Sequence, residues 1–120
     1  MINALSIDVE DWFQVSDFEE KVKRPDWAQY EGRVVQNTAG LLEMLRQHQV
    51  RATFFILTWN AERFPELVQQ IDQDGHEIAT HGYAPHLIYE QTPEEFRADV
   101  MRSLHILEGL TGKKVLGYRA

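Results

Sequence analysis

Hydrophobic residues occur along the chain in two kinds of run, and their order predicts the order of the secondary-structure elements. Three runs are short and apolar or β-rich: "INALSI" at 2–7, "ATFFIL" at 52–57 and "HEIAT" at 76–80. A fourth, "KVLGYRA", occupies 114–120. We expect these four runs to be strands, and the almost wholly apolar run 52–57 is typical of a strand that is covered on both faces.

Between these runs, apolar residues recur at intervals of three and four, which is the spacing of one helix face. The pattern predicts a helix over 33–49, a second within 61–75 that starts near Pro65 and stops at Gly75, and a third over 92–112. The last has the clearest start, because "TPEE" places an N-cap threonine at Thr92, a proline at the first helical position and a capping-box glutamate. The segment 13–32 mixes charges, aromatic residues and a proline, and we interpret it as a long excursion.

Strands that alternate with helices indicate an α/β fold with a parallel sheet or barrel. In such folds, binding and catalytic residues gather at the carboxyl ends of the strands. The ends of the four predicted strands carry these residues, in order: Asp8, Glu10 and Asp11; Thr58 and Trp59; His81 and His86; and Arg119.

The first of these groups, "SIDVEDW" at 6–12, places three carboxylates within four residues. A solvated acidic loop is the common meaning of such a run. Directly after a buried strand, however, two carboxylates can divide roles, with one ionised as a metal ligand and the other accepting a proton.

The run "THGYAPH" at 80–86 offers two imidazoles for a divalent ion, His81 and His86. Their five-residue spacing does not place both on one helix face, and Pro85 favours an extended entry to His86. Any shared ion would therefore be bound from a loop, or from a loop and the first turn of a helix, and Gly82 allows the loop to turn. We expect His86 to be the second ligand, with a two-ligand centre and a solvent-facing His86 as the competing outcome.

The other three histidines are interpreted as structural or surface residues: His48, His76 and His105. An arginine at the end of an apolar strand needs an anionic partner if it is buried, and Asp8 is the natural partner of Arg119. We therefore expect Asp8, one of Glu10 and Asp11, His81 and Arg119 to surround one concavity.

Composition limits the chemistry further. The 120 residues, 43% of them hydrophobic, suit one domain with its own core. Without cysteine, a metal ion must bind to His, Asp or Glu, and a net charge of −7 disfavours nucleic acid or an anionic membrane as partner. The N-terminus lacks a secretory signal and no apolar run reaches about 18 residues, so we expect a cytoplasmic protein without a membrane span.

Taken together, "SIDVEDWF", "RATFFIL", "FPELVQQIDQDGHEIATHGY", "LIYEQTPEEFRADV" and "GYRA" resemble the polysaccharide deacetylases of the NodB-homology type, carbohydrate esterase family four. The branch found with exopolysaccharide export genes is the most similar. The resemblance implies a distorted (β/α) barrel, of which residues 1–120 would be the N-terminal portion. It also implies a divalent metal, often zinc, and removal of N-acetyl or sometimes O-acetyl groups from an acetylated polysaccharide or oligosaccharide.

The same resemblance implies roles for single residues. Asp8 matches the catalytic base, Glu10 or Asp11 the metal-binding acid, and His81 the first metal-binding histidine. The family's second histidine would fall at Pro85, so that His86 stands one residue late, and Arg119 matches the arginine that orients the base.

The family's later motifs, including a general-acid histidine, would lie beyond this sequence. The isolated chain is therefore expected to show no deacetylase turnover, and to be marginally stable or oligomeric. Two other functions stay open: a non-catalytic carbohydrate-binding or scaffold protein, and a small-molecule C–N amidase of the allantoinase type, because one barrel serves several reactions.

Overall fold

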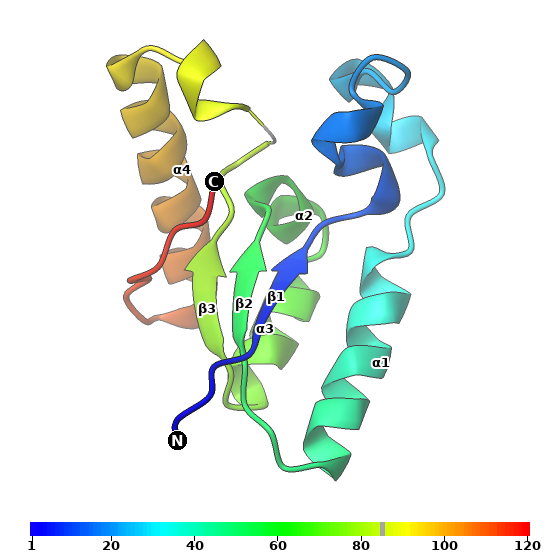
Figure 1. Cartoon of the computed structure of the whole chain (residues 1–120), viewed down its shortest axis with the longest axis vertical. Coiled ribbons are helices and arrows are strands. Elements are labelled where there is room, and N and C mark those ends of the chain that lie inside the picture. Colours follow the sequence, from blue (N-terminus) through cyan, green and yellow to red (C-terminus); the bar gives the residue numbers. More distant parts are fainter. Residues whose placement is uncertain (85) are drawn as a thin grey trace.

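Three parallel strands form the centre of the computed structural model, which describes residues 1–84 and 86–120. The strands are β1 (Ser6–Val9), β2 (Thr53–Ile56) and β3 (Glu77–Thr80), and they lie in the order β1-β2-β3. Each crossover between them contains helix, as parallel strands require (Figure 1). The predicted α/β class with a parallel sheet is confirmed.

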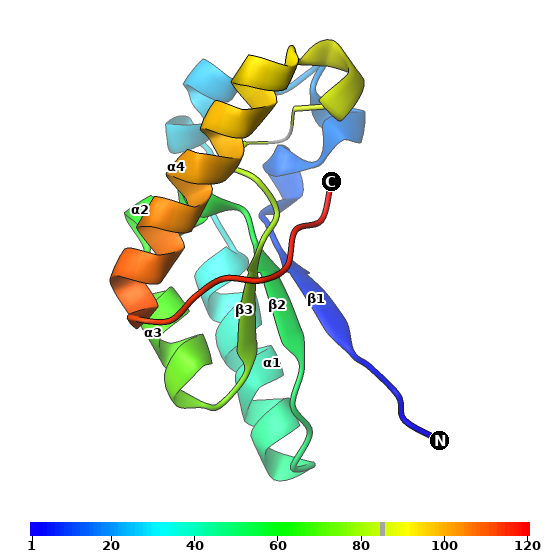
Figure 2. The ribbon, with the colours of Figure 1, turned by 90° about the vertical axis from the view of Figure 1, so that its left-hand side faces the viewer.

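Four α-helices accompany the sheet: α1 (Val34–Gln47), α2 (Thr58–Arg63), α3 (Pro65–Gln73) and α4 (Pro93–Thr111). Figures 1 and 2 show α1, α3 and α4 on one face of the three strands. Apolar side chains from both layers form the main core there, including Phe54, Ile56, Leu42, Ile71 and Leu107.

The opposite face of the sheet carries the residues that alternate with this core. Asp8 is level with Phe55, and Phe55 is level with Ala79. The C-terminal residues cross this face, so that the Arg119 guanidinium lies 4.1 Å from the centre of the Phe55 ring. The sheet therefore presents Asp8 on the face that the C-terminal segment approaches.

The expectation of a fourth strand over 114–120 is wrong. This segment makes one isolated parallel bridge, between Thr80 and Tyr118, with hydrogen bonds from Thr80 N to Gly117 O (2.9 Å) and from Arg119 N to Thr80 O (3.0 Å). The segment pairs with β3 only at Thr80, the last residue of that strand, so it does not extend the sheet along the length of β3.

One helix was not expected, and one boundary differs. The helix predicted to start near Pro65 is confirmed as α3, and Pro65 disfavours helical geometry at Phe64 (φ −129°, ψ 61°) before it, whereas the short helix α2 was not predicted. The first strand begins at Ser6 rather than at residue 2, because pairing with β2 starts at Ser6 and Thr53.

The start of α4 agrees with the prediction. The Thr92 hydroxyl accepts the N–H of Glu95 (3.2 Å), and the Glu95 carboxylate accepts the N–H of Thr92 (2.8 Å). The helix ends at Gly112, which has the left-handed φ of 69° that favours glycine.

The expected excursion contains three short 3-10 helices: η1 (Trp12–Gln14), η2 (Ser16–Phe18) and η3 (Arg24–Gln29). A fourth, η4 (Ile88–Glu90), precedes α4. Phe13, Val22 and Trp27 from the excursion pack with Leu57 and Ala84 in a second apolar cluster beyond the carboxyl ends of the strands. This cluster holds the excursion beside the loop that follows β3. None of the helices in the described part of the chain is both long and apolar enough to cross a membrane.

Candidate metal and acid–base site

Asp8, on β1, is joined to the C-terminal segment. Arg119 Nη1 donates to Asp8 Oδ1 at 2.6 Å, and Nη2 donates to the Ser6 hydroxyl at 2.7 Å. The Asp8 and Arg119 side chains are 35% and 38% exposed, so this pair contributes little to stability and acts mainly on orientation. The predicted partnership of Asp8 and Arg119 is confirmed.

His81, directly after β3, lies between the backbone of Arg119 and the side chain of Glu10. Its Nδ1 is 2.9 Å from the carbonyl oxygen of Arg119, a geometry in which Nδ1–H donates and Nε2 faces the other way. Nε2 is 3.6 Å from Glu10 Oε2. The Glu10 carboxylate raises the pKa of His81 above its ordinary value of 6.5, while partial burial opposes this and the Arg119 carbonyl adds to it.

Asp11 is separated from this group by its own hydrogen bonds. Its side chain, in a residue only 3% exposed, accepts the backbone N–H groups of Trp12 (2.9 Å), Arg33 (2.8 Å) and Val34 (3.1 Å). It thereby caps η1 and fixes the start of α1. The structure brings Glu10, and not Asp11, to His81.

His86 lines the same hollow as Glu10 and His81, but its side chain contacts a different residue. Its Nε2 contacts the guanidinium of Arg24, and the residue is exposed. Within residues 1–84 and 86–120, no group of three or more His, Asp and Glu side chains is arranged to hold a metal ion. The interpretation of Pro85 as an extended entry to His86 concerns a residue outside the described ones.

The remaining expectation, convergence of the strand ends, is confirmed. Asp8, Glu10 and His81 line one hollow of about 270 Å³. Arg119 does not line it, but precedes the lining residue Ala120 in the sequence and bonds to Asp8 and His81. His81 Nε2 and Glu10 Oε2, 3.6 Å apart, can both bind one divalent ion. Two ligand atoms on a tetrahedral zinc, each at ~2.0–2.1 Å from the metal, are about 3.4 Å apart. The Nδ1–carbonyl contact is also the usual way to orient a metal-binding imidazole.

Hydrogen bonds that the sequence did not reveal hold the loop that carries His81. At the start of α2, Thr58 N donates to Gly82 O (2.9 Å) and Trp59 N donates to Tyr83 O (3.0 Å). The Tyr83 N–H points at the Asp99 carboxylate, 3.1 Å from Oδ2. Gly82 has a φ of 81°, and a Cβ there would lie 3.1 Å from Asp99 Oδ2.

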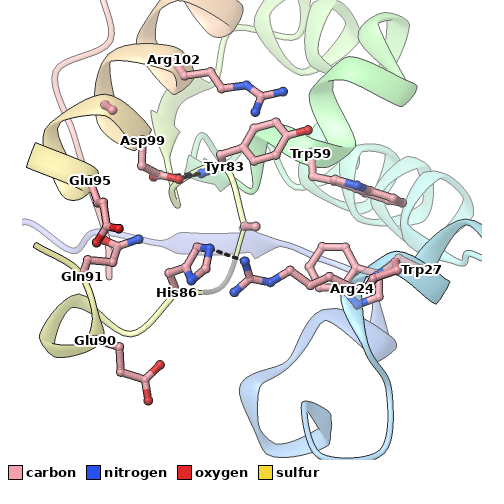
Figure 3. A pocket seen from close by; sticks show the side chains of 13 residues that line it. Arg24, Trp27, Trp59, Tyr83, His86, Glu90, Gln91, Glu95, Asp99 and Arg102 are labelled. Carbon is pink, nitrogen blue, oxygen red and sulfur yellow. Dashed lines mark hydrogen bonds between the residues drawn. The ribbon is translucent and has the colours of Figure 1, made fainter.

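A larger pocket of about 760 Å³ adjoins the hollow, and the two share four lining residues: Ala84, His86, Gln91 and Asp99. Figure 3 shows this pocket between the excursion, the loop after β3 and α4. Its Arg24 and Asp99 were not among the predicted site residues. Only their positions in the folded chain reveal them, since Arg24 and His86 are 62 residues apart in the sequence.

Comparisons with known proteins add independent evidence. The sequence model of the family described as Polysaccharide deacetylase matches residues 26–120. A peptidoglycan-N-acetylglucosamine deacetylase of Bacillus cereus is 37% identical over 82 residues, which are 68% of this chain and 30% of that protein. The chain thus spans about a third of that relative's length.

Solved structures show the same fold. A Mycobacterium smegmatis protein assigned to the polysaccharide deacetylases superposes with a TM-score of 0.80 at 29% identity, over 98% of this chain and 42% of that one. The Bc1960 peptidoglycan N-acetylglucosamine deacetylase superposes with a TM-score of 0.69 at 29% identity, over 92% of this chain and 42% of that one. The three-stranded sheet with its helices is consistent with the expected part of a distorted (β/α) barrel.

Proposed function

Since this chain belongs to the polysaccharide deacetylase family, we propose that it carries the metal-binding and proton-accepting part of a hydrolase that removes N-acetyl groups from an amino-sugar polymer. Because two relatives are named as peptidoglycan N-acetylglucosamine deacetylases, chains of N-acetylglucosamine are the first substrates to test. O-acetyl groups are the second substrate class.

One observation carries this proposal. A carboxylate held by an arginine, Asp8, lies in the same hollow as an imidazole and a second carboxylate that face each other 3.6 Å apart, His81 and Glu10. These groups come from the carboxyl ends of β1 and β3, where parallel α/β folds place their reactive side chains.

The donor set supports Glu10 and His81 as the protein ligands of a divalent ion, with zinc as the natural choice for mixed nitrogen and oxygen donors. When bound, such an ion lowers the pKa of water and polarises the acetyl carbonyl. We assign no ligand role to Asp11, because its carboxylate is already occupied by three backbone N–H groups.

Asp8 is assigned the role of general base. Its carboxylate accepts a proton from the attacking water, and the hydrogen bond from Arg119 Nη1 fixes the direction in which the carboxylate points. The Arg119 carbonyl simultaneously orients the His81 ring through Nδ1, so one residue positions both the base and the imidazole.

Two measurements on the purified protein test the proposal. Isothermal titration with zinc should give binding in the parent protein and none in His81→Ala. Equilibrium binding of N-acetylglucosamine tetramer should then be tighter with zinc than without it, whereas allantoin, as a small cyclic amide, should not bind. A parent protein that binds no zinc, or that prefers allantoin, would refute the proposal.

A further inference from the structure

The pocket beside the candidate metal site has walls from four parts of the chain. Arg24 and Trp27 come from η3, Trp59 from α2, Tyr83 from the loop after β3, and Asp99 from α4 (Figure 3). The pocket shares His86, Gln91 and Asp99 with the hollow around Asp8 and His81, so the two cavities are adjacent.

The lining of this pocket has both apolar surface and groups of each charge. Its aromatic side chains are Trp27, Trp59 and Tyr83, and it also has three carboxylates and two guanidinium groups: Glu90, Glu95, Asp99, Arg24 and Arg102. The mixture does not favour an anion or a cation. It matches a sugar ring, which has apolar C–H faces and a rim of hydroxyl groups that both donate and accept hydrogen bonds.

Two of the aromatic side chains are held in place by arginines. Arg102 lies over the Tyr83 ring at 3.5 Å and also bonds to Glu62, which accepts the Tyr83 hydroxyl at 2.8 Å. Arg63 lies over the Trp59 ring at 4.5 Å. An arginine thus lies over each ring, and the orientation of both aromatic side chains is fixed before a sugar binds.

His86 belongs to this pocket by its contacts. The Arg24 guanidinium carries only donors, so the His86 Nε2 that faces it accepts a hydrogen bond. A metal ion at this nitrogen would have to displace a cation that is already there. His86 is also exposed, as a residue that meets a ligand must be.

We propose that this pocket binds the sugar unit next to the acetylated one, and that His86 and Arg24 contact hydroxyl groups of that unit instead of completing the metal site. The inference rests on the proposed function, because it takes the acetylated unit to lie beside Asp8 and His81. It gives His86 a role in substrate binding rather than in metal binding.

The test compares a long and a short ligand. Binding of N-acetylglucosamine tetramer and of the N-acetylglucosamine monomer is measured by titration calorimetry with the zinc-loaded protein, its His86→Ala and Arg24→Gln variants, and His105→Ala as an exposed control on α4. Loss of one hydrogen bond should weaken tetramer binding about fivefold to tenfold in the two pocket variants. Monomer binding, zinc affinity and the control should not change.

Two results would overturn the inference: a loss of zinc affinity in His86→Ala, or tetramer binding that neither pocket variant weakens. Failure of the proposed function looks different. If the tetramer binds equally well with and without zinc and to His81→Ala, while the pocket variants still weaken it, the sugar pocket stands and the metal-dependent chemistry beside it does not.

Discussion

Asp8 and Arg119 lie 111 residues apart in the sequence and are joined by a 2.6 Å hydrogen bond between Oδ1 and Nη1. The same arginine touches Ser6 and the Phe55 ring with its side chain, and Thr80 and His81 through its backbone. It thus contacts all three strands, beside both the candidate base and the candidate metal-binding imidazole.

The first prediction concerns this arginine. Arg119→Ala should change the free energy of unfolding by at most about 1 kcal/mol, because the pair with Asp8 is more than a third exposed. It should nevertheless release the Asp8 carboxylate, so that the carboxyl-carbon NMR resonance of Asp8 shifts while that of Asp17 does not. An unchanged Asp8 resonance would show that Arg119 does not orient it.

The two neighbouring acids should behave in opposite ways. Asp11→Ala removes the acceptor of three backbone N–H groups in a buried place and should lower the free energy of unfolding by about 1–3 kcal/mol. Glu10→Ala should change it by less than about 1 kcal/mol, since Glu10 faces the hollow. Urea unfolding of both variants measures these changes. Equal losses of unfolding free energy in the two variants would contradict a structural role for Asp11 and a site-facing role for Glu10.

Gly82 is expected to stabilise the conformation of the loop that carries His81. Gly82→Ala forces a side chain into a φ of 81° with its Cβ 3.1 Å from Asp99 Oδ2, and should cost about 1–2 kcal/mol of stability. The matched control is Gly109→Ala in α4, where nothing lies within 4 Å of the added Cβ and helix propensity favours alanine. Thermal unfolding should show a lower Tm for the first variant and an equal or higher Tm for the second.

Stability should also depend on pH through His76. Burial lowers the pKa of His76 below its ordinary value of 6.5, and its Nδ1 accepts the N–H of Ala52 at 3.1 Å. The folded state therefore binds fewer protons than the unfolded state at mildly acidic pH. The stabilisation that neutral, buried His76 gives to the folded state is fully present above pH 6.5. It is lost as the pH falls from 6.5 through the lower pKa of His76 in the folded state.

Urea unfolding between pH 8 and 5, taken as roughly the range over which an imidazole titrates, measures this dependence. The slope should be smaller in His76→Phe, which cannot titrate, and unchanged in the exposed control His105→Gln. Equal slopes in the parent and in His76→Phe would contradict the role given to His76.

The parts of the fold that could be predicted depend on local sequence. The α1 periodicity and the capping box at Thr92 are interactions between residues close in the chain, and both agree with the structure. The segment 114–120 has the apolar character of a strand, but pairing depends on its path over β3, which no local pattern contains. The start of α3 at Pro65 could also be predicted, because proline favours the first helical position.

Some positions in the candidate site could likewise be predicted from the sequence, and others could not. Parallel strand ends meet at one edge, which is why the convergence of Asp8, His81 and Arg119 could be predicted. Alternation along an extended chain places Glu10 on the side of Asp8, and this signal would have favoured Glu10 over Asp11. The contact of His86 with Arg24 depends on how the excursion folds back, and the spacing of the histidines does not contain it.

Zinc titration of the parent protein and of four single variants tests the central claim most directly. The account predicts that Glu10→Gln and His81→Ala each abolish calorimetric zinc binding, while Asp11→Asn and His86→Ala keep the parent affinity within about twofold, a change of about 0.4 kcal/mol. Circular dichroism verifies that each variant is folded. Loss of zinc binding in Asp11→Asn or His86→Ala, with parent affinity retained in Glu10→Gln, would contradict it.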